Sequence, residues 1–344
     1  MKKTIIYIIL STIMFSSMEI ALKMANGAFN PIQLNLIRFC IGGIVLLPIA
    51  RQALKSGSRR LTLADWGLFF ITGFVCVIVS MTLYELAIMN DEASTVAVLF
   101  SCNPVFALIF SYLMLHERLG RANLIAVVVS IVGLVVIVNP AHLTNLFGMM
   151  LAVLSALTFG FYSIVSRYGS LKRHLSGTVM TCYTFIAGTI ELFLLVLLTH
   201  VSSIANWMST VSGLREFANI PVLKNVSLHY FWLLFFIGVC VTGGGFAFYF
   251  LAMETAGVSA ASLVFFIKPA LAPVLAMAVL GEKISLTTTV GIVIIVLGSI
   301  ITFMGNRVKT KESQLATREA KSITIPSSGL QSRQIKHGKN QVHN

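Results

Sequence analysis

Two stretches of this chain, residues 84–119 and 249–284, align with one another without a gap. The identical pairs are Tyr84 and Tyr249, Leu86 and Leu251, Ala87 and Ala252, Ser94 and Ser259, Phe100 and Phe265, Pro104 and Pro269, Ala107 and Ala272, Leu115 and Leu280, and Glu117 and Glu282. The alignment indicates two copies of one structural unit. If each copy contains an odd number of membrane spans, the second copy enters the bilayer in the opposite orientation to the first, which is typical of secondary transporters.

The composition assigns the chain to the membrane proteins. Hydrophobic residues make up 57% of the sequence and charged residues 11%, and the mean hydropathy is +0.89. Soluble domains contain about a quarter charged residues, so this chain has too little polar surface to fold in water. All five cysteines lie inside apolar runs, where a thiol behaves as a small hydrophobic group.

The apolar segments predict an all-α integral membrane protein with ten transmembrane helices, arranged as two inverted five-helix repeats. The predicted spans are residues 4–24, 32–50, 66–88, 95–115, 123–138, 146–166, 178–199, 230–253, 259–280 and 286–304. We expect the first repeat at residues 1–139 and the second at 140–306. The second repeat includes a polar outer connection at 200–229, with a short helix expected near residues 214–217. Residues 307–344 read as a disordered, basic cytoplasmic tail.

Basic residues are concentrated at the N-terminus and in the connections after the second, fourth, sixth and tenth spans. The opposite connections contain only Arg215, Lys224 and Lys283. The positive-inside rule therefore places both termini in the cytoplasm. The net charge of +13 is explained by this topology and by the tail, so no nucleic-acid partner is required.

Pro104 and Pro269 lie near the middle of the fourth and ninth spans, and Pro273 follows one turn after Pro269. A proline inside a helix removes one backbone hydrogen bond, so we expect the carbonyl groups of Phe100 and Phe265 to lack their usual donors. Breaks at matching positions in both repeats indicate a binding cavity near the bilayer centre. Kinks that serve only helix packing are the alternative.

Lys268 directly precedes Pro269, and Asn103 holds the equivalent position in the first repeat. An ammonium group at the bilayer centre costs upward of about 2.5 kcal/mol on insertion scales, so it requires a wet cavity, a carboxylate or an anionic ligand. Its side chain is too short to reach either interface. The alternative to a role in binding is a permanent structural pair with Glu19 or Glu85.

Two predicted helices carry polar stripes. The stripe of the first helix is Thr12, Ser16, Glu19 and Lys23, and the stripe of the sixth is Ser155, Phe159, Tyr162 and Ser166. Spacings of three and four residues put each set on one helix face, which we expect to point toward protein or water. Glu19 and Lys23 form a local ion pair in one interpretation. In the other, Glu19 is a proton-binding carboxyl group.

Arg38 and Glu85 lie in the outward halves of the second and third spans, as Glu19 and Lys23 do in the first. We therefore expect four ionisable groups to converge on the outer side of one cavity. For Arg38 and Glu85, structural pairing and contact with a ligand are both open.

Small residues precede Tyr249, the repeat equivalent of Tyr84. Gly244 and Gly245 either allow close helix packing or act as a hinge. Glu117 and Glu282 lie in turns between helices, where a carboxylate can cap the helix that follows.

The sequence contains no phosphate-binding glycine loop, no His-Glu-x-x-His, no Cys-x-x-Cys and no Gly-x-Ser-x-Gly motif. The seven histidines are dispersed, which argues against a metal site. We expect neither an enzyme nor a bound cofactor or metal, so that transport draws on a gradient, with a proton or another ion as a candidate coupling ion.

The turns Glu117-Arg118-Leu119 and Gly281-Glu282-Lys283-Ile284 resemble those of the drug/metabolite transporter superfamily, in particular its EamA-type permeases. The Pro-Val-Phe-Ala-Leu stretch from Pro104, matched by Pro-Ala-Leu-Ala-Pro from Pro269, is also similar to that family. The resemblance covers about residues 4–304. It implies ten helices around a central cavity, lined mainly by helices one, three, four, six, eight and nine. It also implies a bacterial cytoplasmic membrane protein, often an exporter of amino acids or related metabolites. His116, in place of the usual glycine, and the long connection from residue 200 depart from the family pattern.

We expect an alternating-access transporter that exports a small zwitterionic or anionic metabolite, such as an amino acid. The predicted substrate-binding residues are Lys268, Arg38, Glu19, Glu85, Tyr84, Tyr249, Asn103, Ser16 and Tyr162. Lys268 and Arg38 suit a carboxylate, whereas Glu19 and Glu85 suit an amino group or a proton. A proton-coupled exporter of lipophilic cations that uses Glu19 is the alternative, and a membrane-embedded enzyme or scaffold is a third. The expected partners are the solute and the lipid bilayer, with no prediction of oligomeric state.

Overall fold

The computed structural model describes residues 2–116, 121–138, 145–211, 217–256, 263–298, 300–301 and 304. These residues are largely helical, and the only β-type pairing among them is an isolated bridge between Asn26 and Phe29. Residues 1–303 form one compact unit. The predicted tail at 307–344, Glu117 and residues 214–216 of the short helix expected near 214–217 lie outside the described part of the chain.

The described helices agree with an all-α, multi-pass membrane protein. Seven of them are long and apolar enough to cross a membrane: Lys3–Ala25, Pro31–Ser56, Leu63–Asn90, Ala93–Leu115, Leu146–Arg173, Gly177–Leu198 and Phe231–Met253. Leu124–Ile137, Ile267–Leu280 and Leu286–Gly298 are shorter apolar helices. Seven of the predicted spans thus correspond to described helices that are long enough to cross a membrane, and the total of ten spans stays a prediction.

Several of these spans consist of more than one element. The first comprises α1 (Lys2–Ser16) and α2 (Met18–Ala25), and the second is α3 (Pro31–Ser56). The third comprises α4 (Leu63–Gly73), the π-helix η1 (Phe74–Ser80) and α5 (Met81–Asn90), and the fourth comprises α6 (Ala93–Phe100) and α7 (Asn103–Leu115). Next come α8 (Arg121–Val138), α9 (Leu146–Arg173), α10 (Gly177–Leu198) and α11 (Ser202–Thr210). The last labelled elements are α12 (Phe231–Phe235), the π-helix η3 (Phe236–Gly244), α13 (Gly245–Ala256) and α15 (Leu263–Leu280).

Capping side chains set several helix starts. The Asn30 side chain accepts hydrogen bonds from the first free amides of α3, with Pro31 in the first turn. Thr62 and Asp65 form a reciprocal capping box at the start of α4. Ser176 caps α10 in the same way, through its hydroxyl group. These caps end the connections and fix where each apolar helix begins.

The predicted breaks at the prolines differ between the two halves. The fourth span is split at Ser101, so Pro104 lies in the first turn of α7 and not inside a helix. The carbonyl group of Phe100, expected to lack a donor, accepts a hydrogen bond from Asn103 Nδ2 at 2.8 Å. By contrast, α15 continues through Pro269 and Pro273. The prediction of matching breaks at the prolines is therefore wrong for the ninth span.

The two halves instead share π-helical segments at corresponding positions. Segment η1 precedes Tyr84, and η3 precedes Tyr249, its repeat equivalent. A π-helical turn widens the helix and leaves backbone groups to be satisfied by neighbours. In η1, Ser80 Oγ donates to the carbonyl of Ser155 in α9, and Ser155 Oγ donates back to the carbonyl of Ser80, at 3.0 and 2.9 Å. These reciprocal bonds hold η1 against α9.

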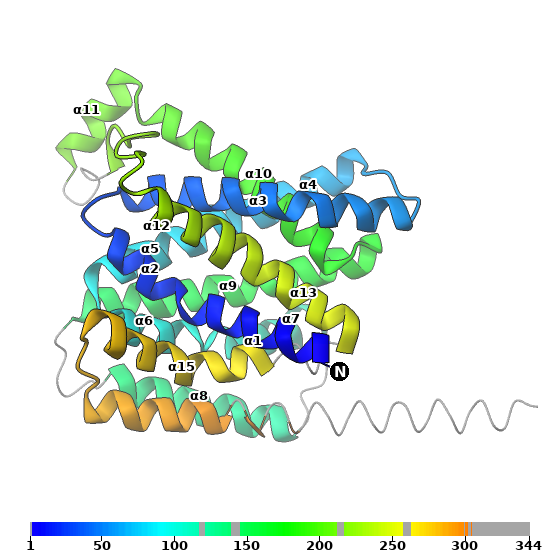
Figure 1. The fold of residues 1–344 in the computed structure, drawn as a ribbon, viewed down its shortest axis with the longest axis vertical. Coiled ribbons are helices and arrows are strands. Elements are labelled where there is room, and N and C mark those ends of the chain that lie inside the picture. The colour runs from blue at the N-terminus through cyan, green and yellow to red at the C-terminus, as the bar shows by residue number, and fades with distance from the viewer. Residues whose placement is uncertain are drawn as a thin grey trace, which may run out of the picture. The chain divides into compact units, whose positions relative to one another are not determined.

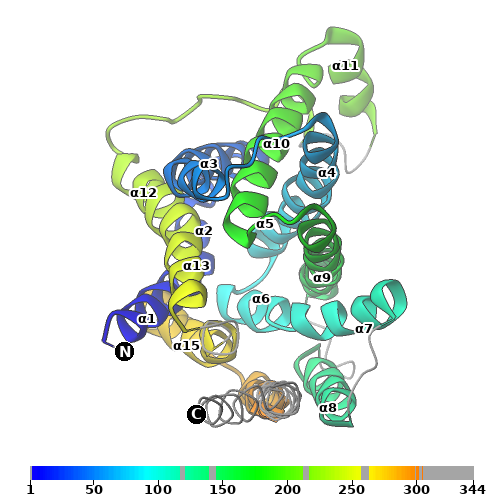
Figure 2. The same cartoon turned by 90° about the vertical axis from the view of Figure 1, so that its right-hand side faces the viewer.

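Consecutive spans run in opposite directions in Figure 1, with the connections after α2 and α5, the end of α15 and the helix α11 at one end of the unit. We call this end the α11 end. Helix α10 packs against α3 and α4, α9 packs against α5, α6 and α7, and α1 packs against α13 and α15. Viewed along the helices in Figure 2, these elements surround a common interior.

Candidate functional site

A cavity lies in the interior, and its lining comes from α1, α2, α3, η1, α5, α6, α7, α9, α10, α13 and α15. Its aromatic lining residues are Phe15, Phe39, Phe100, Phe159, Tyr162, Phe185, Phe246 and Phe265, and the others are Met18, Arg38, Cys76, Met81, Ser101, Asn103, Pro104 and Lys268. The space open to the centres of water molecules is about 40 Å³. That volume holds about three waters. Side chains must therefore move before a larger solute fits in this cavity.

Lys268 forms an ion pair on the wall of this cavity. Its Nζ lies 2.7 Å from Oε1 of Glu19, and the two side chains are 5% and 1% exposed. The ammonium group also lies 5.3 Å from the ring centroid of Phe100. The pair joins α15 to α2, so Lys268 does form the pairing with Glu19 that the sequence offered as an alternative. Although it is paired, Lys268 also lines the cavity.

Arg38 and Glu85 form a second buried pair, between α3 and α5. The Nε of Arg38 lies 2.9 Å from Oε1 of Glu85, and both side chains are at most 3% exposed. The guanidinium carbon is 4.3 Å from the ring centroid of Phe39. Arg38 lines the central cavity, whereas Glu85 borders a separate small cavity next to Asn26 and Phe29. Of the two residues, only Arg38 is positioned to meet a solute in the central cavity.

Lys23 does not join this group. Its ammonium donates to the backbone carbonyls of Ile88, at 2.8 Å, and of Asp91. The local ion pair with Glu19 is therefore absent, and the predicted convergence of four ionisable groups is wrong for Lys23. The reason is that Lys23 lies one turn beyond Glu19, where the carbonyl groups at the end of α5 are within reach of its side chain.

Glu282 caps a helix far away in the sequence. Its Oε1 and Oε2 accept from the backbone amides of Ala93 and Ser94, at 2.8 and 2.9 Å. The sequence analysis expected this carboxylate to cap the helix that follows it, but it caps α6. Close by, Ile20, Ala93 and Ala276 form a small buried cluster that joins α2, α6 and α15. These contacts hold α2, α6 and α15 together at the α11 end.

The other predicted site residues differ in whether they line the cavity. Tyr162 and Asn103 line the cavity. Tyr84 is fully buried against the Phe100 ring, at 4.6 Å between centroids, and Tyr249 packs on Phe265 at 5.1 Å. Both tyrosines therefore support cavity residues and do not line the cavity themselves.

Ser16, Gly244 and Gly245 also lie away from the cavity wall. The hydroxyl group of Ser16 is buried without a hydrogen-bond partner among the described residues. A methyl group at Gly245 would lie 2.7 Å from the Phe15 ring, which favours close packing at that position. At Gly244 the nearest atom to such a methyl group belongs to its own helix, at 3.2 Å, so the hinge stays a prediction there.

Sequence reasoning missed half of the aromatic lining. Phe15, Phe39, Phe185 and Phe246 were not singled out, although Phe39 follows Arg38 and Phe15 precedes the polar Ser16. Apolar side chains in a membrane helix face lipid and protein alike, so no residue pattern distinguishes the side chains that line the cavity from those that face lipid. In the described part of the chain no three His, Cys, Asp or Glu side chains form a metal-binding group.

Apolar helices that cross the membrane repeatedly, around a cavity with buried ion pairs on its wall, define a multi-pass membrane transporter. The chain belongs to the EamA-like transporter family, whose model matches residues 2–139 and again residues 146–304. Members of this family are transporters and not enzymes, and they act on small-molecule solutes at a membrane. The resemblance stated from the turn and proline motifs is confirmed.

Relatives and solved structures agree with this assignment. An uncharacterized transporter of Clostridium kluyveri is 34% identical over 318 residues, which cover 89% of this chain and 95% of the relative. A probable terminal-alkyne amino-acid exporter of Streptantibioticus cattleyicolor is 24% identical, over 82% of this chain and 87% of its own. A protein of known crystal structure matches with a TM-score of 0.57 at 18% identity, covering 88% of this chain and 95% of that chain, which shows a shared fold.

Proposed function

We propose that this protein exports a small, amino-acid-like zwitterion across the bacterial cytoplasmic membrane by alternating access. The ten apolar segments then act as two inverted five-helix repeats, residues 1–139 and 140–306, with both termini in the cytoplasm. The two matches to the family model and the alternating direction of the helices in Figure 1 support this arrangement. The name of the Streptantibioticus relative, an amino-acid exporter, supports the substrate class.

The observation that carries the proposal is the Lys268–Glu19 pair on the cavity wall. A zwitterion contains one carboxylate and one ammonium, so it can insert between these two side chains and form an ion pair with each. Lys268 then binds the solute carboxylate, and Glu19 binds its ammonium. Because removing one partner of a buried pair costs about 3–5 kcal/mol, such an exchange is favourable only when both partners are replaced together.

The charge balance of the cavity favours a zwitterion over an anion. Lys268 is neutralised by Glu19, and Arg38 by Glu85, so the two pairs have no net charge. A solute with a net charge would bring that charge uncompensated into a low-dielectric interior, which is strongly unfavourable. A zwitterion adds none. This sharpens the sequence-based expectation, which included anions as well as zwitterions.

The closed α11 end supports alternating access. Three contacts join the elements that must separate to open this end. Glu282 caps α6, Lys23 donates to carbonyl groups of α5, and the cluster of Ile20, Ala93 and Ala276 joins α2, α6 and α15. In the proposed topology the α11 end faces outward, so the structure corresponds to an outward-closed state. Release of the solute outward then requires these contacts to break.

An exporter of lipophilic cations is the second candidate, because the aromatic lining suits cation–π contacts. It would need a free Glu19 carboxylate. The ammonium of Lys268, 2.7 Å from that carboxylate, competes directly with any cationic solute. Loss of resistance to cationic dyes in a Glu19→Gln strain, with no change in amino-acid efflux, would favour this candidate over the zwitterion exporter.

The test uses the full-length protein in proteoliposomes loaded with a mixture of labelled amino acids. Efflux is followed for the wild type, for Lys268→Ala and for Lys283→Ala, whose lysine is exposed in a connection after α15. We expect Lys268→Ala to reduce efflux of the transported amino acid by at least tenfold, and Lys283→Ala to leave it unchanged. Unaltered efflux by correctly inserted Lys268→Ala protein would refute the proposal.

A further inference from the structure

We propose that the solute has a large apolar side group, which binds between the two aromatic walls of the central cavity. This inference rests on the proposed function, because it concerns the same site and assumes that the charged end of the solute meets Lys268. It goes beyond the proposed function because it names the chemistry of the uncharged end of the solute. The reasons are the arrangement of the aromatic rings, the scarcity of polar atoms around them and the adaptability of two methionines.

The first wall is a continuous series of rings from four helices. Phe39 meets Phe185 at 4.7 Å between ring centroids, Phe185 meets Phe246 at 5.2 Å, and Phe246 meets Phe15 at 4.9 Å. The three contacts are all edge-to-face, the geometry that aromatic pairs prefer. The wall is therefore a well-packed apolar surface supplied by α3, α10, α13 and α1.

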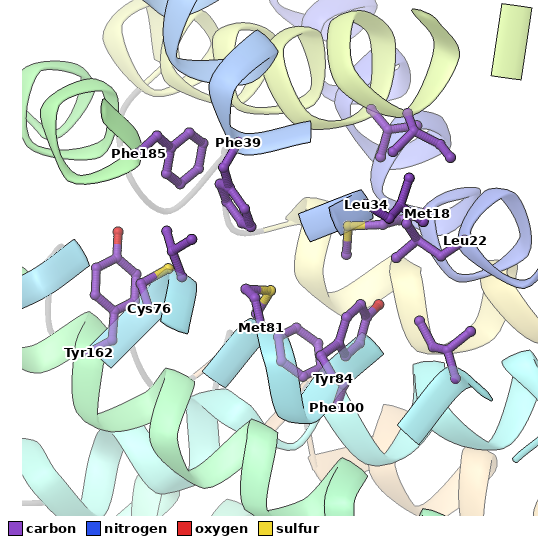
Figure 3. Close-up of a cluster of buried hydrophobic side chains, with 14 of the residues drawn as sticks. Met18, Leu22, Leu34, Phe39, Cys76, Met81, Tyr84, Phe100, Tyr162 and Phe185 are labelled. Carbon is purple, nitrogen blue, oxygen red and sulfur yellow. The ribbon is translucent and has the colours of Figure 1, made fainter. Parts of the chain in front are cut away.

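The second wall lies across the cavity. Phe100 meets Phe159 at 5.2 Å, and Phe159 meets Tyr162 at 5.3 Å. Figure 3 shows Phe39 and Phe185 on one side of the interior, with Tyr162, Cys76 and Met81 facing them from the other. Both walls line the same cavity. A solute side group between them would meet carbon and sulfur atoms on both faces.

Polar atoms are few along these walls. Among the lining residues, the charged or amide side chains are Arg38, Asn103 and Lys268. Arg38 and Lys268 are already paired, and Asn103 uses its Nδ2 for the carbonyl of Phe100. Ser101 and Tyr162 add two hydroxyl groups, and Nη2 of Arg38 has no partner among the described residues, so a polar side group would find few replacements for its hydrogen bonds to water. An apolar side group would gain from each methylene that it buries.

The small volume of the cavity does not oppose the inference. Met18 and Met81 lie on the lining, and methionine is the side chain that adapts its shape most readily. Their displacement would enlarge the space between the walls while the rings stay in place.

The experiment measures binding of amino acids that share one charged end and differ in side group. Purified full-length protein in lipid nanodiscs is titrated by calorimetry with glycine, serine, leucine and phenylalanine. We expect leucine and phenylalanine to bind at least tenfold more tightly than glycine, and serine no more tightly than glycine. Glycine and serine binding as tightly as the larger two would overturn this inference and leave the proposed function standing. Binding of none of the four would contradict both.

Two phenylalanines of one helix provide a matched pair of variants. Phe185 lies on the cavity, whereas Phe193, also in α10, is 41% exposed on the outer surface of the helix. We expect Phe185→Ser to lower the preference for leucine over glycine at least fivefold, and Phe193→Ser to preserve it. If Phe185→Ser fails to fold, Cys76→Leu serves instead, because it fills the space opposite Phe185 and should weaken phenylalanine binding more than glycine binding. Equal effects on both amino acids would count against the inference.

Discussion

The carboxylate of Glu282 lies 2.8 Å from the backbone nitrogen of Ala93, so a residue of the second family match caps a helix of the first. The second carboxylate oxygen binds the next amide, that of Ser94. A carboxylate at a helix N-terminus satisfies free amides and interacts favourably with the helix dipole. Under the proposed alternating access, this contact stabilises closure of the α11 end.

Glu282→Ala should therefore open this end more often. Loss of a helix cap costs about 1 kcal/mol, which corresponds to about a fivefold change in an equilibrium constant. The measurement is the rate at which a maleimide modifies a cysteine introduced at Ala276, which is buried in the closed state. We expect the rate to rise about fivefold in purified Glu282→Ala protein. Glu92→Ala, which removes an exposed carboxylate nearby, is the control, and an equal rise there would contradict the prediction.

Glu85→Ala should destabilise the fold strongly. It leaves Arg38 buried without its carboxylate, and such a loss costs about 3–5 kcal/mol. The double variant Arg38→Met and Glu85→Met removes both charges and should recover most of the stability. Thermal unfolding in detergent measures both effects. A double variant no more stable than Glu85→Ala would show that the pair does not behave as one unit.

Asn103→Ala should weaken the junction of α6 and α7. Its side-chain amide supplies the hydrogen bond that Pro104 cannot give to the carbonyl of Phe100, and an unsatisfied buried carbonyl costs about 1–3 kcal/mol. The same unfolding assay detects the loss. Asn90→Ala is the matched control, because the Asn90 amide also donates to a backbone carbonyl but in an exposed position, where water replaces it. Equal effects of the two substitutions would contradict this explanation.

Stability should depend on pH through the acidic groups at the α11 end. Burial raises the pKa of Asp91 from 3.8 to about 6, and the negative charges of Glu92 and Glu282 act in the same direction. At a pH between these two pKa values, Asp91 is protonated more often in the folded state than in the unfolded state. Stability therefore rises as the pH falls from about 6 toward 4. The pKa of Glu92, which is mostly exposed, is raised by its partial burial and by the negative charge of Glu282, with the same sign of effect.

Asp91→Asn separates these contributions. The variant should show a smaller rise in unfolding temperature than the wild type when the pH is lowered from 7 to 4.5. The remaining rise would reflect Glu92 and other carboxyl groups. Parallel profiles for the two proteins would show that Asp91 does not titrate in this range.

Membrane class and family could be read from the sequence, because apolar spans and turn motifs are local signals. The pairing of Lys268 with Glu19 was one of two sequence-based alternatives, since a buried ammonium has few possible partners. Asn103 was recognised as the equivalent of Lys268, and a break was predicted near Pro104, but no residue pattern revealed that the Asn103 side chain would donate to the carbonyl of Phe100. The uninterrupted α15 likewise depends on packing against neighbours that tolerate Pro269 and Pro273.

Long-range partners account for the remaining differences between the sequence-based expectations and the structure. Glu282 was expected to act locally, yet α6 approaches it from 188 residues earlier in the chain. Lys23 was placed with Glu19 by helical spacing, but the end of α5 supplies carbonyl acceptors that this spacing does not reveal. In both cases the charged side chain binds a helix end, because the free backbone groups there compete with side chains for charged partners.

The central claim is that a charge-balanced cavity exchanges its Lys268–Glu19 pair for a zwitterion. The most direct test compares the affinity of the wild type for the amino acid that it binds most tightly with its affinity for two analogues, one without the carboxylate and one without the amino group. The account predicts that each analogue binds at least tenfold more weakly, and that Lys268→Met removes most of the difference between the amino acid and the analogue without a carboxylate. An analogue with a net charge that binds the wild type as tightly as the amino acid would contradict the account.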